Sequence, residues 1–439
     1  MSAHLPIATL LASLSLLVPR LAATQGTPSP VPTPAPALTL TLEEAQARAR
    51  RVSPALAAAR EAAAAAAARA RQAGAFANPT LSFQREQTSR GAQENSQNVV
   101  TLDQPIEFGL RPARRAAAEH RSEAAAARLR DAESQLALDV TRAYADALAA
   151  DRRAALADTA ATAFERARRV SDERVAAGDV SGYANRRIRI EAARYAVLRT
   201  EALLAQGSAR RTLAALVAPS DGVLGAADAL ALTDTSDATG VPAAGAPAPV
   251  DSLVALALVQ RGELAAIRLD AQAAQADATL VARERWPTPV LSGGIKTEEQ
   301  TGIGGFRGLA VGIALPLPLW DRRGGAVEAA GAEWRRAEAS VALARRRIEV
   351  EVRDAAASLR VVDEQLTVLR PVLGAESALA LRAAEVAYAE GEIALVEWLD
   401  AVRAYHEAES GFATLRSELL IRRAALERAV GLPLRRSAP

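Results

Sequence analysis

An alternating pattern stands out in residues 307–320, which read RGLAVGIALPLPLW. Large apolar side chains occupy every second position from Leu309 to Leu319, with glycine, alanine or proline between them. Because successive side chains of a strand point to opposite faces, this period of two predicts an extended segment with one apolar face. A second such segment is expected at Val100, Leu102, Gln104, Ile106 and Phe108. Partner strands are predicted at 80–87 and 290–297, reached through polar loops at 88–96 and 298–305.

These strands belong to an internal repeat of the chain. The matched landmarks, in order, are Leu56 with Leu264, Pro79 with Pro287, Pro105 with Pro316, and Gly178 with Gly391. Their offsets grow only from 208 to 213 residues, so small insertions account for the differences. The ordered agreement predicts two copies of one unit. Each copy would hold a helix, a β-hairpin, a very long helix, a glycine turn and a further long helix.

Four aromatic residues mark one end of the two hairpins. Phe76 and Trp286 stand where a helix leads into a strand, and Phe108 and Trp320 where a strand leads back to a helix. Ordinary hairpins packed on soluble helices would also show a period of two. Aromatic residues gathered at one end are instead typical of the lipid interface of a membrane barrel. Four strands cannot close a barrel, since the smallest have about eight, so several chains would have to pool their strands.

The long helices carry a seam of mostly small residues. In the first copy the seam is Val140, Ala143, Ala147, Ala150, Ala154, Ala157, Ala161 and Phe164, and in the second it runs from Ile348 to Leu373. Alternating steps of three and four residues form the heptad pattern of packed helices. The stretch from Pro112 to Asp172 would make an unbroken helix of roughly 90 Å at 1.5 Å per residue. Taken by itself, this seam is better explained by a plain structural coiled coil.

Composition narrows the functional class. The chain has 53 Lys and Arg against 51 Asp and Glu, a net charge of +2, which offers no strong cationic field for nucleic acid. With 0 Cys it can form neither a disulfide nor a zinc–thiolate site. The histidines at 4, 120 and 406 are too far apart in sequence to suggest a metal or catalytic cluster. Without a phosphate loop or nucleophile motif, we expect no enzyme, no cofactor and no bound metal.

The N-terminus resembles a secretory signal. An apolar run from Ile7 to Val18 precedes the small residues Ala22 and Ala23, so residues 1–23 are expected to be a signal peptide. A short membrane anchor is the alternative, although a spanning helix needs about 20 apolar residues. The alternating prolines within residues 24–38 predict an extended polyproline tether.

Together these features resemble the TolC-like family of outer-membrane efflux factors. The resemblance rests on the twofold repeat and on three stretches: NPTLSF at 78–83, PLPLWDR at 316–322 and YAEGEI at 388–393. The second stretch is most similar to the branch of CzcC-like cation-efflux channels, and drug-exporting relatives fit as well.

The resemblance implies a mainly α fold with a β-barrel portion. In such a TolC-like homotrimer, four strands per chain form a twelve-stranded outer-membrane barrel, continued by a long periplasmic α-helical barrel. Repeat 1 would span 39–219, with a hairpin at 79–108 and coiled-coil helices at 112–218. An equatorial linker would follow at 220–250. Repeat 2 would span 251–433, with a hairpin at 288–319 and coiled-coil helices at 325–430, before a tail at 434–439.

The resemblance also implies roles for residues at the helical turns. The turns at Gly178 and Asp179 and at Gly391 and Glu392 would be periplasmic tips that dock an adaptor, and Phe76, Phe108, Trp286 and Trp320 would lie at the membrane interface.

A constriction is implied at Glu397 and Asp400, six and nine residues after Gly391. The same offsets from Gly178 reach Ala184 and Arg187, so only the second repeat supplies acids. A spacing of three places both carboxylates on one helical face, and three copies would make two stacked acidic rings that favour cations. Solvated carboxylates, paired with Arg403, are the alternative.

The function that the resemblance implies is the passive outer-membrane channel of a tripartite efflux system. The homotrimer would export small molecules or metal cations, delivered by an inner-membrane efflux pump through a periplasmic adaptor protein. It would contact outer-membrane lipid and no nucleic acid. The alternative is a periplasmic coiled-coil scaffold or adaptor without a membrane barrel, which leaves the aromatic residues at one end of the hairpins unexplained.

Overall fold

The computed structural model describes residues 38–178, 181–219, 230–233, 249–371, 373 and 375–433. The expected signal peptide, the C-terminal tail and Asp179 lie outside the described residues, as do nearly all of the tether and most of the linker at 220–250. The equatorial role of that linker therefore stays a prediction.

The two hairpins join in a single antiparallel sheet with the order β2-β3-β5-β6. The strands are β2 (Thr80–Arg90), β3 (Gln93–Pro105), β5 (Val290–Gln300) and β6 (Gly304–Ala314). The two repeats meet along β3 and β5, from Asn95 opposite Gln300 to Pro105 opposite Val290. Among the described residues, β2 and β6 each keep one edge without a paired strand.

The strand ends differ from those predicted. Most of the residues expected in polar loops belong to the ladder, because β2 reaches Arg90 and β5 reaches Gln300. Side-chain hydrogen bonds between strands stabilise these polar ends, as between Gln87 and Glu94 at 3.0 Å. At the other end, Phe108 and the segment 315–319 lie outside the strands, so their predicted extension was wrong. Pro316 and Pro318 have no N–H to donate to a ladder.

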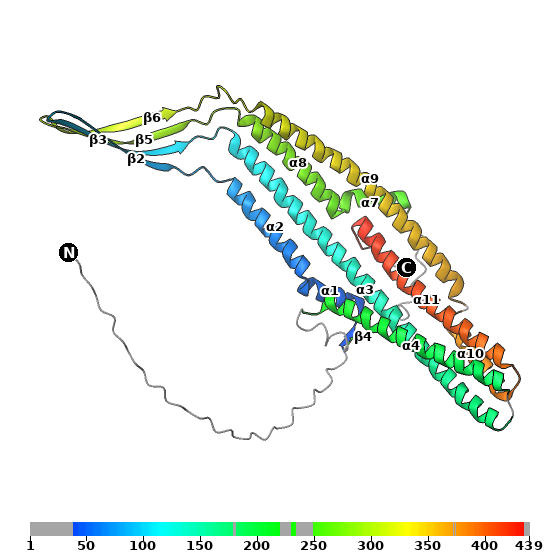
Figure 1. Cartoon of the computed structure of the whole chain (residues 1–439). Helices are drawn as coiled ribbons and strands as arrows, with labels where there is room; N and C mark the ends of the chain where they lie inside the picture. The colour runs from blue at the N-terminus through cyan, green and yellow to red at the C-terminus, as the bar shows by residue number, and fades with distance from the viewer. Residues whose placement is uncertain are drawn as a thin grey trace, which may run out of the picture. The chain divides into compact units, whose positions relative to one another are not determined.

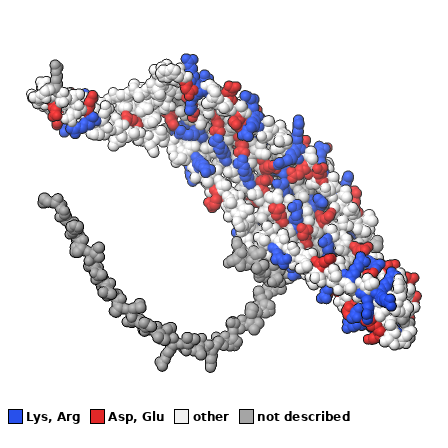
Figure 2. Space-filling model, in the orientation of Figure 1, with Lys and Arg blue, Asp and Glu red and all other residues white. Residues whose placement is uncertain are grey.

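One face of the sheet is apolar and the other is polar or small. The register places Phe83, Val100, Ile295 and Leu309 in one row across the four strands, and all four side chains are exposed in the single chain. The next row, on the opposite face, holds Ser82, Thr101, Gly294 and Ala310. Between the hairpin ends and the helices the visible surface carries few charged residues (Figure 2). This alternation is the one predicted from the sequence.

Near the sheet, the helices follow the same lateral order as the strands (Figure 1). There α2 (Pro54–Ala73) packs on α3 (Leu110–Ala176), α3 on α8 (Gly262–Arg283), and α8 on α9 (Gly324–Leu369). Farther from the sheet α4 (Gly182–Val217) packs on α3, and α3 packs on α11 (Leu395–Val430). In turn, α11 packs on α9 and on α10 (Ala375–Glu390).

The helical seam of the first repeat is a packing face, as predicted. All eight seam residues from Val140 to Phe164 are buried within α3, a single helix of 67 residues. The second repeat differs, because α9 ends at Leu369 and α10 begins only at Ala375. The unbroken seam predicted to reach Leu373 was therefore wrong. Pro371 lies in this break and cannot donate the backbone hydrogen bond that would continue the helix.

The shorter elements brace the long helices. The parallel pair of β1 (Leu38–Leu40) and β4 (Leu230–Leu232) lies against α3, where the buried Tyr144 hydroxyl is 2.9 Å from the Leu40 carbonyl oxygen and 2.7 Å from that of Thr233. α1 (Leu42–Val52) packs on α3 and α4, and α7 (Val250–Gln260) on α9 and α11. No helix in the described part of the chain combines the length and the apolar character needed to cross a membrane.

Candidate functional site

The two glycine turns lie at the end of the helices that is remote from the sheet (Figure 1). Gly178 and Gly391 have φ angles of +83° and +82°, in the left-handed region that favours glycine. At the second turn the Gly391 N–H donates to the Tyr388 carbonyl at 3.2 Å, and the Glu392 N–H to the Ala387 carbonyl at 2.8 Å. These two bonds define a Schellman motif, which satisfies the last carbonyls of α10. A Cβ at either glycine would meet no atom within 4 Å, so both turns are open to a partner.

Glu397 has a local role at the start of α11. Its carboxylate accepts a hydrogen bond from the Ala394 N–H at 3.1 Å, as the glutamate of a capping box does. Its side chain is nevertheless exposed. Helix capping therefore explains part of why an acid stands here, and it leaves the second carboxylate oxygen free to face solvent.

Asp400 follows one turn later and is 66 % exposed. Its carboxylate lies 3.8 Å from Arg403, which also pairs with Glu191, a buried carboxylate of α4. Arg403 thus ties α11 to α4, and Asp400 sits at the rim of that ion pair. In the single chain both acids agree with the alternative of solvated helix carboxylates, because the predicted rings need further copies of the chain.

A buried aromatic cluster, which the sequence did not predict, holds these turns in place. Phe164 of α3 stacks on Tyr195 of α4 with ring centroids 4.4 Å apart, and it meets Trp398 of α11 edge-on at 5.2 Å. Trp398 stacks in turn on Tyr388 of α10 at 5.3 Å. Burial raises the pKa of Tyr195 and lowers that of His406, whose ring lies beside it. Phe164 at the end of the Ala-rich seam was the one sequence signal that could have located this cluster.

All four predicted interface aromatics lie in the connections between helices and strands. Phe76 precedes β2, Phe108 follows β3, Trp286 precedes β5 and Trp320 follows β6, and each side chain is exposed. The guanidinium of Arg111 lies 3.9 Å from the centre of the Phe76 ring, close enough for a cation–π contact. Their position at one end of the sheet is as expected, and their contact with lipid stays a prediction.

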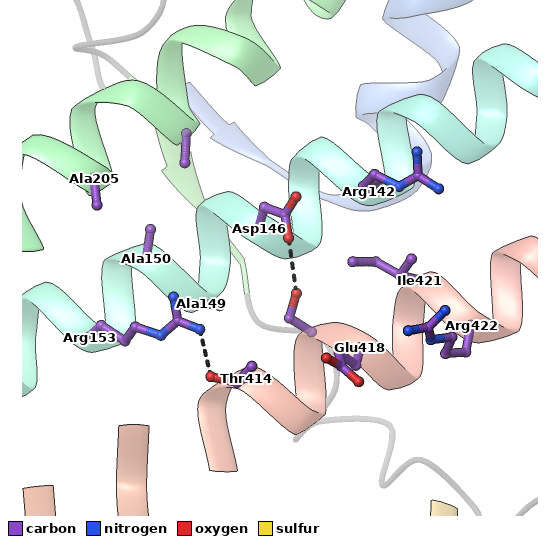
Figure 3. Close-up of a pocket in the computed structure, with 12 residues that line it drawn as sticks. Arg142, Asp146, Ala149, Ala150, Arg153, Ala205, Thr414, Glu418, Ile421 and Arg422 are labelled. Carbon is purple, nitrogen blue, oxygen red and sulfur yellow. Dashed lines mark hydrogen bonds between the residues drawn. The ribbon is translucent and has the colours of Figure 1, made fainter. Parts of the chain in front are cut away.

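A charged groove with a volume of about 460 Å³ lies between α3, α4 and α11 (Figure 3). Arg153 donates to the Thr414 hydroxyl oxygen at 2.5 Å, and the Ser417 hydroxyl lies 3.5 Å from the Asp146 carboxylate. Burial in this groove raises the pKa of Asp146. On α3 these residues face away from Tyr144, which packs against β1 and β4. The groove gives this face of the long helices a hydrophilic surface.

No group of three or more His, Asp or Glu side chains in the described ranges is placed to hold a metal ion. The described residues present exposed carboxylates at the turns, a charged groove midway along the helices, and an apolar sheet face at the other end.

Comparison with known proteins identifies a shared fold. Residues 253–432 match the family model described as outer membrane efflux protein. The cobalt-zinc-cadmium resistance protein CzcC of Cupriavidus metallidurans is 26 % identical over 339 residues, which cover 77 % of each chain.

Two solved structures agree along nearly the whole chain. A membrane protein from Pseudomonas aeruginosa superposes with a TM-score of 0.72 at 21 % identity, covering 89 % of this chain and 93 % of that one. CusC, whose structures were solved in connection with transmembrane channel formation, superposes with a TM-score of 0.72 at 17 % identity. The match covers 94 % of this chain and 99 % of CusC. The fold expected from the sequence is confirmed.

Proposed function

We propose that this chain is the outer-membrane channel of a tripartite efflux system. The premise is that it belongs to the TolC-like outer-membrane efflux proteins, the family that its fold and residues 253–432 indicate. The channel is a passive conduit with no chemistry of its own. An inner-membrane pump supplies the cargo, and a periplasmic adaptor protein joins pump and channel. The chain resides in the outer membrane and extends into the periplasm.

The observation that carries this proposal is the exposed apolar face of the four-stranded sheet. Leu81, Phe83, Leu309, Val311 and Ile313 all lie on this face, and none is covered by another part of the described chain. Such a continuous apolar surface is costly in water and favourable against lipid tails. The opposite face is polar or small, as the lumen side of a membrane barrel is. A soluble coiled-coil scaffold gives no reason for this division.

The free edges of β2 and β6 support assembly from several copies. An unpaired strand edge in a bilayer leaves N–H and C=O groups without partners, at a cost of several kcal/mol per group. Pairing β2 of one copy with β6 of the next removes both edges. Three copies then close a barrel of twelve strands, within the range that such barrels span.

The turns at the far end of the helices are the proposed docking site for the adaptor. Gly178, Gly391 and Glu392 are exposed there. Figure 2 shows that Lys and Arg gather on the visible face at this end. The adaptor's own tip would therefore be expected to carry acidic residues.

The proposed constriction consists of Glu397 and Asp400 from three copies. Six carboxylates converging in a narrow mouth attract cations and repel anions much more strongly than isolated surface acids do. The relative CzcC is named for resistance to cobalt, zinc and cadmium, so divalent metal cations are the cargo class to test first, with small organic molecules as the other class.

Purification in detergent tests the channel. We expect native mass measurement to give a homotrimer and planar bilayers to show cation-selective conductance. Replacing Glu397 and Asp400 together by Ala should raise the conductance and weaken the cation preference, whereas replacing the exposed Glu376 and Glu385 of α10 should not. A monomer that stays soluble without detergent would support the scaffold alternative. If the variant without Glu397 and Asp400 matched the native trimer in conductance and cation preference, neither acid would form a constriction, and both would have only their roles within α11.

A further inference from the structure

A row of hydrogen-bond donors borders the apolar face of the sheet near the hairpin ends. The register places one residue of each strand in this row, in the order Arg85, Asn98, Thr297 and Arg307. It is the next row on the same face beyond that of Phe83, Val100, Ile295 and Leu309, two residues along each strand and farther from the helices. We call these four residues the donor row. It holds two cations and no acid.

The donor row is not satisfied by its own chain. Within the described part of the chain, no ion pair or side-chain hydrogen bond engages any of its four members, and both arginines are exposed. The nearest acid on this face by register, Glu299, stands one row farther out and pairs with neither arginine. These side chains are therefore free to bind a partner.

The opposite face differs at the same strand ends. There the Lys296 ammonium lies 3.3 Å from the Glu298 carboxylate, which also accepts a hydrogen bond from the Asn95 amide at 3.3 Å. The cation on the polar face is thus neutralised within the chain, whereas the two arginines on the apolar face are not. An unpaired arginine beside an apolar surface indicates an anionic partner at the border of that surface.

The position of the donor row matches the far boundary of a membrane span. From the predicted interface aromatics to the donor row, the chain counts nine, ten, eleven and thirteen residues along β2, β3, β5 and β6. A tilted membrane strand needs about 9–11 residues. At about 3.3 Å per residue and a tilt of about 40°, eleven residues rise about 28 Å. With the aromatics at the periplasmic interface, the donor row lies at the outer one.

We propose that the donor row binds the phosphate groups of an anionic lipid in the outer leaflet, namely lipid A. The planar guanidinium of arginine donates two parallel N–H bonds to a phosphate. A long side chain at the edge of the apolar band reaches the headgroups while its stem stays beside the acyl chains. The Asn98 amide and the Thr297 hydroxyl supply neutral donors between the two cations. The proposal rests on the proposed function and deepens it, since it names a lipid that the channel recognises.

The spacing of the two arginines favours a lipid with more than one phosphate. Arg85 and Arg307 stand on β2 and β6, three strand-to-strand steps apart. At about 4.8 Å per step, this is about 14 Å, which is too far for one phosphate to contact both. Lipid A carries two phosphates, one at each end of its disaccharide, and can therefore engage both arginines of one chain.

Native mass measurement of the full-length trimer in detergent tests the site by titration with lipid A. We expect Arg85→Gln with Arg307→Gln to bind lipid A at least about tenfold more weakly than the native trimer. Arg85→Lys with Arg307→Lys keeps both charges and should retain most of the binding. The control, Arg346→Gln with Arg382→Gln, removes two exposed arginines of α9 and α10 that have no ion pair in the described chain, and it should bind as the native trimer does.

The probes distinguish the possible sources of phosphate. Lipid A stripped of its phosphates and phosphatidylglycerol, which has only one, should both bind more weakly than lipid A. Equal binding of the stripped lipid would overturn the role of phosphate, and equal binding of phosphatidylglycerol would overturn the choice of lipid A. Full displacement of lipid A by millimolar inorganic phosphate would show a site for free phosphate, and would likewise overturn the lipid site.

The oligomeric state separates this proposal from the channel proposal. A native trimer that binds lipid A no better than the variant without Arg85 and Arg307 would overturn the lipid site and leave the channel standing. A chain that stays monomeric and soluble without detergent would overturn both.

Discussion

Two neighbouring glycines of β5 give a sharp test of how the sheet is held together. Gly294 lies opposite Thr101 of β3. A Cβ built on Gly294 would be 2.7 Å from the Thr101 Cα and 2.8 Å from the Val100 carbonyl carbon, and still closer to the Val100 carbonyl oxygen. A Cβ on Gly293 would meet nothing within 4 Å. The same substitution, Gly→Ala, should therefore be damaging at Gly294 and almost neutral at the adjacent Gly293.

The cost of Gly294→Ala follows from this geometry. Ordinary contact begins near 3.4 Å, so β3 and β5 must separate locally by several tenths of an ångström or more. Breaking two ladder hydrogen bonds costs about 1 kcal/mol each, and overpacking adds about 1–3 kcal/mol. The expected loss is roughly 3–5 kcal/mol of stability where the two repeats join. Gly293→Ala adds one methyl to the exposed apolar face and should change stability by about 0.5 kcal/mol or less.

The assay compares both variants with the native chain after extraction in detergent. Gly294→Ala should lower the temperature at which the assembled oligomer dissociates and speed hydrogen exchange of the β3 and β5 amides. Gly293→Ala should match the native protein in both measurements. Equal heat resistance and equal exchange for the two variants would refute the close approach of β3 to β5 at Gly294.

Three further predictions concern the helices. Phe164→Ala removes a fully buried ring of the aromatic cluster and should lower the free energy of unfolding by about 3–5 kcal/mol in thermal denaturation, whereas Phe108→Ala, which truncates an exposed ring, should have little effect. Arg261→Met removes a buried guanidinium that pairs with Glu351 and Glu263. Because these carboxylates keep Arg428 and Arg347 as partners, the loss should be only about 1–3 kcal/mol by the same measurement, and no loss at all would contradict the importance of these ion pairs. A hydrogen bond from Arg189 of α4 is the main cause that holds the pKa of Asp172 of α3 below its ordinary value. This link between the two helices therefore stabilises the tip above about pH 4, and the stabilisation is lost as the pH falls through the lowered pKa. Acidification should therefore speed hydrogen exchange at the start of α4 in the native chain but not in Asp172→Asn, and equal pH profiles would contradict the link.

Local periodicity was sufficient to predict much of this fold from the sequence. The alternation at Leu309, Val311 and Ile313 identified the apolar sheet face, because a strand turns every second side chain to the same side. The seam from Val140 to Phe164 identified the buried side of α3 for the corresponding reason in a helix. The two turn glycines were found because both repeats place them at matching positions, and their positive φ angles show why glycine stands there.

Contacts between distant segments and single residues decided the features that periodicity did not predict. The strand ends depend on cross-strand partners, so polar residues expected in loops entered the ladder through pairs such as Gln87 with Glu94. The break between α9 and α10 makes the second repeat differ from the first, although the two look alike in sequence. The difference arises because Pro371 has no counterpart at the matching position of α3.

The aromatic cluster needed four helices to come together, and no local pattern records which of them meet. For the same reason the sequence suggested that Glu397 and Asp400 share a helical face, whereas only the tertiary structure showed that one caps α11 and the other borders the ion pair of Arg403 with Glu191. Periodicity specifies which side of an element is buried, and packing between elements specifies what that side touches.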